Sequence, residues 1–146
     1  MSVCLTQARA RARRFAISGV LVAAVAFVVP ASSQASAYGI QYFGTRTIDG
    51  YTIPGGQLAH YISGSGLFIA WDGANFGSIG NLCDSSIEFT YGYGSRVLKS
   101  SVHWGCSHVG QWKYALNWRA PRGSACARLY VDDWRHYVTQ QCHFVS

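Results

Sequence analysis

Carboxylate side chains are scarce in this chain. Glu88 is its one glutamate, and the other acidic residues are aspartates that stand mainly in turn-forming contexts: Asp49, Asp72, Asp84, Asp132 and Asp133. Glycoside hydrolysis usually needs two carboxyl groups that flank one bond, and the sequence offers no such pair. It also lacks the Gly-x-Ser-x-Gly turn of many serine hydrolases. A small hydrolase is therefore kept only as a third interpretation, and no catalytic residue and no cofactor are predicted.

Long apolar runs are absent as well, apart from one near the start. The stretch from Phe15 to Val29 is too short to span a membrane comfortably. It follows a group of arginines and precedes Pro30 and the small residues Ala35-Ser36-Ala37. This order predicts a removable secretory signal peptide over residues 1–37, with Tyr38 as the first residue of the secreted chain. A retained N-terminal anchor is the alternative.

Basic residues gather in that same segment. The whole chain has a formal net charge of +6. Residues 38–146 hold eight Lys or Arg against six Asp or Glu, a net charge of +2 (8 − 6), with no two basic residues adjacent. Nucleic-acid-binding domains carry clusters of basic residues. We therefore predict no nucleic-acid partner, and no membrane association once the signal is removed.

The number of cysteines indicates how they pair. Removal of residues 1–37 discards Cys4 and leaves an even set of four: Cys83, Cys106, Cys126 and Cys142. An even set in an exported chain predicts two disulfides in an oxidising compartment. The predicted location is therefore extracellular.

Helical periodicity is missing from residues 38–146. Short runs that alternate between apolar and polar residues are separated by Gly, Ser, Asn and Asp, and Tyr and Trp are frequent. This pattern predicts one all-β domain over residues 38–146. The expected architecture is a compact antiparallel sandwich or small barrel of about seven to nine short strands.

A first hairpin is expected around a two-residue turn at Gly64-Ser65. It would pair Ile62 with Leu67 and His60 with Ile69. Both faces of this hairpin are apolar, so we expect it to be central and covered on two sides. His60 is then a hydrogen-bonded core histidine rather than a ligand contact.

A second hairpin is expected around Gly94-Ser95. Its register separates an apolar face from a polar one and places Glu88 diagonal to Lys99, within reach of an ion pair. Two closing strands, over 125–131 and 137–145, are expected around Asp132-Asp133.

The same register predicts the disulfides. Extending the second hairpin brings Ser85 opposite Trp104 and Cys83 opposite Cys106, so we predict a Cys83–Cys106 bridge. A Cys126–Cys142 bridge follows by elimination. Crossed pairing between the hairpins stays open, because directly opposed cysteines are often strained.

The segment His103-Trp104-Gly105-Cys106-Ser107-His108 contains the residue types of a metal site. A zinc site needs about four ligands, usually as two spaced pairs, and the second pair is missing. Oxidation of Cys106 would also remove the thiolate that a metal or a nucleophilic mechanism needs. His103 and His108 are therefore weak metal candidates, and the prediction is that no metal binds.

Two segments are candidates for binding a target. The glycine-rich stretch 72–81 is expected to be a long loop that exposes Asn75 and Phe76, and such loops often carry binding function. The stripe Trp112, Tyr114 and Trp118 suits stacking on sugar rings. Ordinary sheet core is the alternative for the stripe, and a structural loop is the alternative for 72–81.

A third segment suits protease inhibition. Arg119-Ala120-Pro121-Arg122-Gly123 precedes Cys126, and a trypsin-like protease accepts arginine at its specificity pocket. Arg119 and Arg122 are the candidate inhibitory residues.

Three segments also carry a resemblance: 56–66, Ser124-Ala125-Cys126-Ala127 and Gln141-Cys142-His143. Together they resemble small secreted β-rich disulfide proteins of actinobacteria. The resemblance spans most of residues 38–146. It implies an extracellular setting and implies no activity.

These observations favour a small secreted, non-catalytic binding domain whose target is an extracellular macromolecule or glycan. The alternative is a secreted effector such as a protease inhibitor or an antimicrobial protein. The oligomeric state is left open by the sequence.

The signal-peptide prediction is tested by the mass of the secreted protein. It should begin at Tyr38 and weigh about four mass units less than the reduced chain, because each of two disulfides removes two hydrogens. A chain that begins upstream of residue 38, or one that carries free thiols, would contradict the prediction.

Overall fold

The computed structural model describes residues 36–146, in which every regular element is a β-strand. The strands are β1 (Ala37–Phe43), β2 (Arg46–Ile48), β3 (Tyr51–Ile53), β4 (Gly56–Ser65), β5 (Phe68–Tyr91), β6 (Arg96–Lys99), β7 (His103–Arg119), β8 (Gly123–Val131) and β9 (His136–Val145). The fold-class prediction is confirmed.

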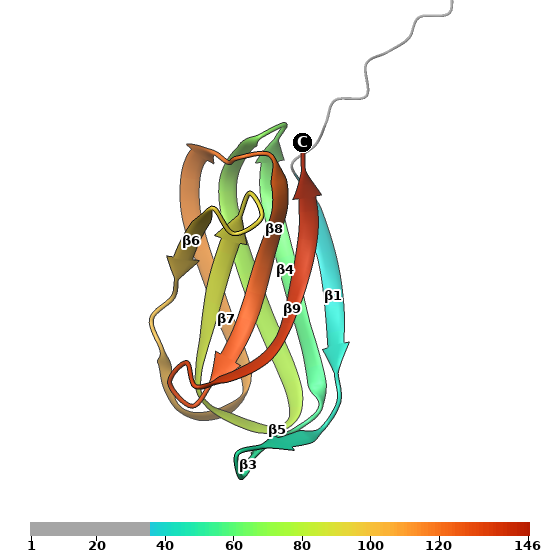
Figure 1. Cartoon of the computed structure of the whole chain (residues 1–146), viewed down its shortest axis with the longest axis vertical. Helices are drawn as coiled ribbons and strands as arrows, with labels where there is room; N and C mark the ends of the chain where they lie inside the picture. Colours follow the sequence, from blue (N-terminus) through green and yellow to red (C-terminus); the bar gives the residue numbers. More distant parts are fainter. Residues whose placement is uncertain (1–35) are drawn as a thin grey trace, which may run out of the picture. The chain divides into compact units, whose positions relative to one another are not determined.

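One strand organises the domain. β5 is 24 residues long, and its ladder with β7 is interrupted between Gly77 and Leu82. Its first part pairs with β4 on one side and β7 on the other, and β1 adds to β4. Its second part pairs with β8, β6 and the start of β7, and β9 adds to β8. We call these the first layer and the second layer (Figure 1).

The two layers nearly close into a barrel. β1 of the first layer lies beside β9 of the second, as Figure 1 shows, and Gly39 packs against Gln141 and His143. Within residues 36–146 no backbone ladder joins these two strands. β2 and β3 form a separate two-stranded hairpin.

Apolar side chains fill the space between the layers. Ten of the hydrophobic residues there are inaccessible to solvent: Ile53, Leu58, Ile69, Ala74, Leu82, Ile87, Phe89, Ala127, Leu129 and Val131. The burial of such side chains is the main stabilising contribution to a fold of this kind.

Both predicted disulfides are confirmed. Cys83 is directly opposite Cys106, and Cys126 is directly opposite Cys142. The closing pair of strands is also confirmed, with a turn at Asp132–Arg135 and left-handed backbone from Asp132 to Trp134. The first bridge holds β7 on β5, and the second joins β8 to β9.

The register of the first hairpin was predicted wrongly. The turn is at Gly66-Leu67, so Ser65 is opposite Phe68 and His60 is opposite Ala74. Gly66 adopts a left-handed conformation that glycine tolerates at no steric cost. The expected cover on both faces is also wrong, because the outer face of the first layer is exposed at Asn75 and at Gln111 opposite it.

The loop expected over 72–81 is a continuous part of β5. Asp72, Ala74 and Phe76 point inward and are buried, while Asn75 between them is exposed. This is the two-residue period of a strand. The glycines made the segment look like a loop. In the strand, Gly73 and Gly77 instead leave space on the outer face.

The second hairpin is shifted by two residues from its predicted register. Gly92, Tyr93 and Gly94 are all left-handed, so the turn is longer and Tyr91 pairs with Arg96. A shift of two residues leaves each side chain on its predicted face. Glu88 therefore still meets Lys99, now directly opposite and at 3.9 Å.

A bulge produces a further difference in that ladder. Ser85 is opposite His103 and not Trp104, because the register shifts between Cys83 and Ser85. Asp84, at the shift, is left-handed and accepts a hydrogen bond from the Gly105 amide at 2.8 Å.

The predicted signal segment 1–37 lies almost wholly outside the described residues. Between residues 36 and 146 there is no helix long and apolar enough to cross a membrane. Two disulfides together with this finding are consistent with a secreted or extracellular protein.

Replacing Cys126 and Cys142 together by alanine should lower the free energy of unfolding by about 3 kcal/mol. The bridge closes a loop with a sequence separation of 16 residues, and loops of this size gain about that much from cross-linking. Urea unfolding followed by tryptophan fluorescence measures the change. An unchanged unfolding midpoint would show that the bridge does not stabilise the fold.

Candidate binding face

The outer surface of the first layer carries three rows of residues in register across four strands. We call this surface the outer tyrosine face. Its rows are Tyr42, Gln57, Gly77 and Val109; then Ile40, Ala59, Asn75 and Gln111; then Tyr38, Tyr61, Gly73 and Lys113. Directly opposed residues share a face, so the register alone brings these side chains together. With strand spacings and residue rises of usual size, the three rows cover roughly 14 by 14 Å.

Several large apolar side chains are exposed on this face. Tyr38 is 66 % exposed, Tyr42 69 % and Val109 56 %, and Ile79 just beyond the first row is 85 % exposed. Exposed apolar surface that is concentrated in one place commonly marks an interaction site.

Two amides occupy the middle of the face. Asn75 of β5 and Gln111 of β7 are directly opposite and both exposed. The Gln111 amide donates to the Tyr61 hydroxyl at 3.4 Å. Each amide offers both donors and acceptors, so this row can hydrogen-bond to hydroxyl or amide groups of a ligand.

An aromatic pair lies beyond the amides. Tyr61 meets Trp71 edge to face with ring centroids 5.4 Å apart, and Lys113 Nζ lies 4.3 Å from the Trp71 ring centre. Such contacts hold the rings in place before any ligand arrives. These contacts hold Tyr61 and Trp71 at one end of the face.

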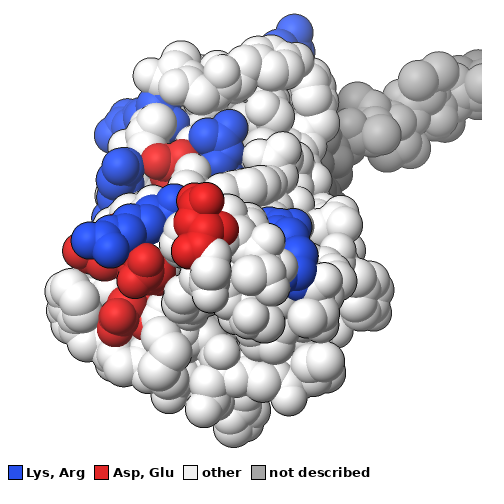
Figure 2. All heavy atoms as spheres, turned by 60° about the horizontal axis from the view of Figure 1, so that its bottom comes forward, with Lys and Arg blue, Asp and Glu red and all other residues white. Residues whose placement is uncertain are grey.

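Charge is almost excluded from the outer tyrosine face. Among the described residues, Lys113 is the one charged side chain in its three rows. The ion pairs between basic and acidic side chains near the surface lie in the second layer, including Glu88 with Arg128 at 3.1 Å. Figure 2 shows the Asp and Glu side chains gathered among Lys and Arg on one part of the surface. The two layers thus present surfaces of different chemistry.

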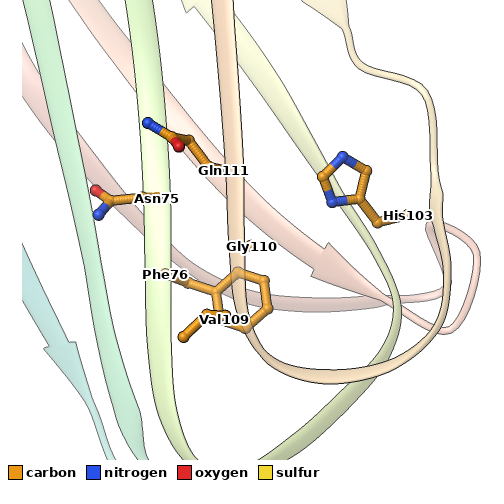
Figure 3. A pocket seen from close by; sticks show the side chains of 6 residues that line it. All are labelled: Asn75, Phe76, His103, Val109, Gly110 and Gln111. Carbon is orange, nitrogen blue, oxygen red and sulfur yellow. The ribbon is translucent and has the colours of Figure 1, made fainter.

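Three depressions adjoin the face. One of about 430 Å³ is lined by Tyr42, Gly56, Gln57, Gly77, Ser78, Ile79, His108 and Val109. One of about 380 Å³ is lined by Ser36, Ala37, Tyr38, Tyr61, Ile62, Ser63 and Trp71. A third of about 520 Å³ includes Asn75, Gln111 and the Phe76 ring beside Gly110, with His103 across from them (Figure 3). All three are shallow depressions that are open to solvent.

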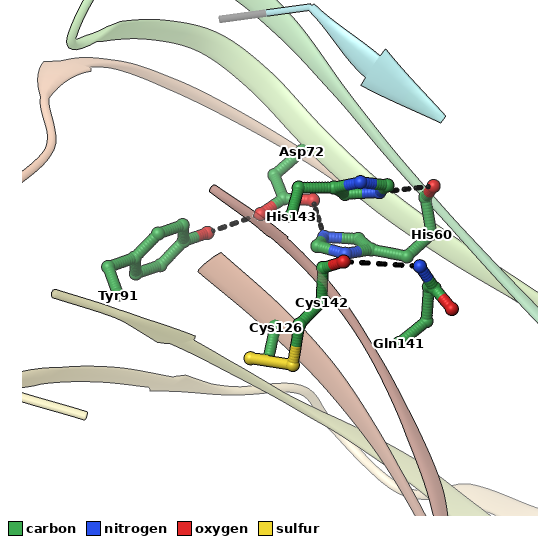
Figure 4. Close-up of polar contacts among 7 residues, drawn as sticks. All are labelled: His60, Asp72, Tyr91, Cys126, Gln141, Cys142 and His143. Carbon is green, nitrogen blue, oxygen red and sulfur yellow. Dashed lines mark hydrogen bonds and ion pairs between the residues drawn. A yellow bond between two sulfur atoms is a disulfide. The ribbon is translucent and has the colours of Figure 1, made fainter. Parts of the chain in front are cut away.

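A buried polar network lies on the inner side of the same strands (Figure 4). His60 donates from Nε2 to Asp72 at 2.8 Å, and the Tyr91 hydroxyl donates to the same carboxylate at 2.7 Å. His143 contacts the His60 carbonyl at 3.1 Å. The prediction of a hydrogen-bonded core histidine is confirmed, since His60 is inaccessible to solvent.

The network contains residue types that occur in catalytic sites, but solvent does not reach its His60 and Asp72 side chains. Asp72 and His60 are both fully buried, so no dissolved substrate reaches them. Burial, reinforced by Asp72, raises the pKa of Tyr91 well above its usual range and keeps the hydroxyl protonated. Burial also lowers the pKa of His143. The network is a structural link between β4, β5 and β9.

The predicted binding residues are divided between two sides of the first layer. Asn75 is exposed on the outer tyrosine face, but Phe76 is 2 % exposed, so the expectation that its ring is exposed is wrong. Trp112 is also buried, and Tyr114 and Trp118 pack against the core. The core alternative for the aromatic stripe is what the structure shows.

The predicted inhibitory arginines flank a short connection. Arg119 ends β7 and Arg122 precedes β8, and both are exposed. Between them, Ala120 is buried and donates its amide to the Leu67 carbonyl at 2.8 Å. Pro121 packs beside Gly92. The connection is held against the end of the domain rather than projecting from it.

The weak metal candidates are separated. His103 stacks on Trp112 with centroids 4.5 Å apart, whereas His108 lines the depression beside Tyr42. Cys106 is in a disulfide. In the part of the chain that the structure describes, no three His, Cys, Asp or Glu side chains are placed to hold a metal.

Most of the outer tyrosine face was missed by sequence reasoning. Tyr38, Ile40 and Tyr42 alternate with Gly39 and Gln41 at the period of a strand, and this signal was available in the sequence. The partners of β1 were not predictable, because the first hairpin was placed in the wrong register.

In comparisons with known proteins, no family model, no curated protein and no solved structure matches this chain. The candidate site therefore rests on the geometry alone.

The lowered pKa of His143 gives a pH test of the buried network. The unfolded state then binds more protons than the folded state, so stability is complete above about pH 6.5 and falls as the pH decreases below it. His143→Gln keeps an amide donor for the His60 carbonyl and removes the titration. The loss in unfolding free energy between neutral and mildly acidic pH should be smaller in this variant than in the wild type, as urea unfolding measures. Equal losses would show that His143 does not contribute.

Proposed function

We propose that this protein is a small secreted, non-catalytic domain that binds a glycan on the outer tyrosine face. The observation that carries the proposal is the exposed, nearly uncharged sheet surface on which tyrosines flank a central amide row. The C–H groups on one face of a sugar ring pack on aromatic rings, and sugar hydroxyls hydrogen-bond to amides. The face offers both kinds of contact in one plane.

The disulfides and the predicted signal peptide support secretion. Secretion would bring this surface into contact with polysaccharides in the medium or on cell walls. Rigidity favours binding because fewer side chains need to be ordered on association. The contacts among Tyr61, Trp71 and Gln111 provide that order in the free protein.

A protease inhibitor is the second interpretation of the sequence, through Arg119 and Arg122. No contact in the described residues favours it over glycan binding. Trypsin assayed with the purified domain separates the two, because tight inhibition would place the function at the β7–β8 connection.

The proposal is tested by retention on insoluble chitin, cellulose and peptidoglycan. The wild-type domain should be retained on at least one of them. Tyr42→Ala should reduce the affinity about tenfold, the usual loss when a stacking aromatic is removed. Val97→Ala is the control, because Val97 is 49 % exposed and lies on β6, in the second layer.

Two results would contradict the proposal. Retention on none of the three glycans would remove its basis. Retention that Tyr42→Ala and Val97→Ala change equally would place the site elsewhere on the surface.

A further inference from the structure

Two glycines of β5 shape the outer tyrosine face. Gly77 lies in the row of Tyr42 and Val109, and Gly73 lies in the row of Tyr38 and Tyr61. They are four residues apart on one strand, which is about 13 Å. Each one belongs to a different end of the face.

Gly77 opens the first end. A Cβ placed on this residue would meet no atom within 4 Å, so the space above the backbone is empty. Tyr42 and Gln57 lie on one side of that space, and Val109 lies on the other. The depression of about 430 Å³ has this opening as part of its floor. The depression is large enough for one sugar ring. Aromatic and apolar side chains form its wall.

Gly73 leaves room for the Tyr61 ring at the second end of the face. A Cβ on this residue would lie 2.3 to 2.5 Å from the Tyr61 ring and hydroxyl, so the ring rests directly on the backbone of β5. The Gln111 amide and the edge contact with Trp71 fix its position. Tyr61 thereby forms a platform that lies along the sheet rather than projecting from it.

The proposal rests on the glycan-binding function given above. We infer that the ligand is a neutral polysaccharide that runs along β5, with one sugar ring over Gly77 and another on Tyr61. Asn75 and Gln111 hydrogen-bond to the segment between these rings. A single sugar does not span about 13 Å, whereas a chain of several rings does.

The charge distribution selects a neutral chain. Lys113 is the one charged side chain in the rows of this face among the described residues, and its Nζ lies over the Trp71 ring. An anionic polysaccharide would be bound through several Lys or Arg side chains, and its affinity would fall with salt. Uncharged amides and aromatic rings match hydroxyl and N-acetyl groups instead.

Titration calorimetry with soluble oligosaccharides tests the chain length and charge. Chitohexaose or cellohexaose should bind at least about ten times more tightly than chitobiose or cellobiose, because the short sugars fill one end only. The affinity should not change between low and high sodium chloride. Equal affinity for the short and long sugars would overturn the two-ended site.

Gly77→Val tests the opening itself. Valine suits a strand and its Cβ meets no atom within 4 Å, so the unfolding midpoint should be unchanged while affinity for the hexasaccharide falls about tenfold. Gly44→Ala is the control, since Gly44 also has open space around its Cβ and lies outside the three rows. Gly73→Ala should weaken binding as well, by lifting Tyr61 from the backbone.

The outcomes separate this inference from the proposed function. Binding to no glycan in any form would refute the function and the inference together. Binding that Gly77→Val leaves intact would refute the inference while the glycan-binding function stands. Salt-sensitive binding to polygalacturonate or hyaluronate alone would refute the neutral ligand, and binding of a protein in place of any sugar would refute both.

Discussion

Asp72 lies between the two layers, where its carboxylate accepts hydrogen bonds from Tyr91 and His60. A buried carboxylate without such partners costs several kcal/mol, so Asp72 is stable there only while β4 and both parts of β5 keep their places. The orientation of β5 follows from this constraint. Because strand side chains alternate, an inward Asp72 requires Gly73, Asn75 and Gly77 to face outward. The buried Asp72 thus determines which residues of β5 lie on the outer face.

The aromatic residues of the first layer lie on both of its sides. The ring of Trp112 fills the interior, whereas Tyr38, Tyr42 and Tyr61 remain outside. Charges are concentrated in the second layer, where Glu88 pairs with Arg128 and Lys99. This division leaves the first layer with a surface suited to an uncharged partner. The length of β5 permits it, since one strand of 24 residues serves both layers while each keeps its own outer face.

Sequence reasoning predicted the features that depend on local or covalent chemistry. Cys83–Cys106 was predicted by extending the second hairpin, and it is correct although the register near the turn was wrong by two residues, because a further shift lies between Cys83 and Ser85. His60 was expected in the core because its neighbours on the strand are apolar. The failures came from glycine. Gly64-Ser65 looked like a turn that is really at Gly66-Leu67, and the glycines of 72–81 looked like a loop. Glycine gives no burial signal of its own, so only the paired strands reveal whether it marks a turn or makes room on a surface.

We propose that a glycan binds on the outer tyrosine face, which β5 presents to solvent. Backbone amide chemical shifts recorded by NMR during a titration with chitohexaose or cellohexaose would locate the binding site. We expect the shifted amides to lie in β1, β4, residues 73–79 of β5 and residues 109–113 of β7. Shifts confined to β6, β8 and β9, or to Arg119 and Arg122, would contradict it.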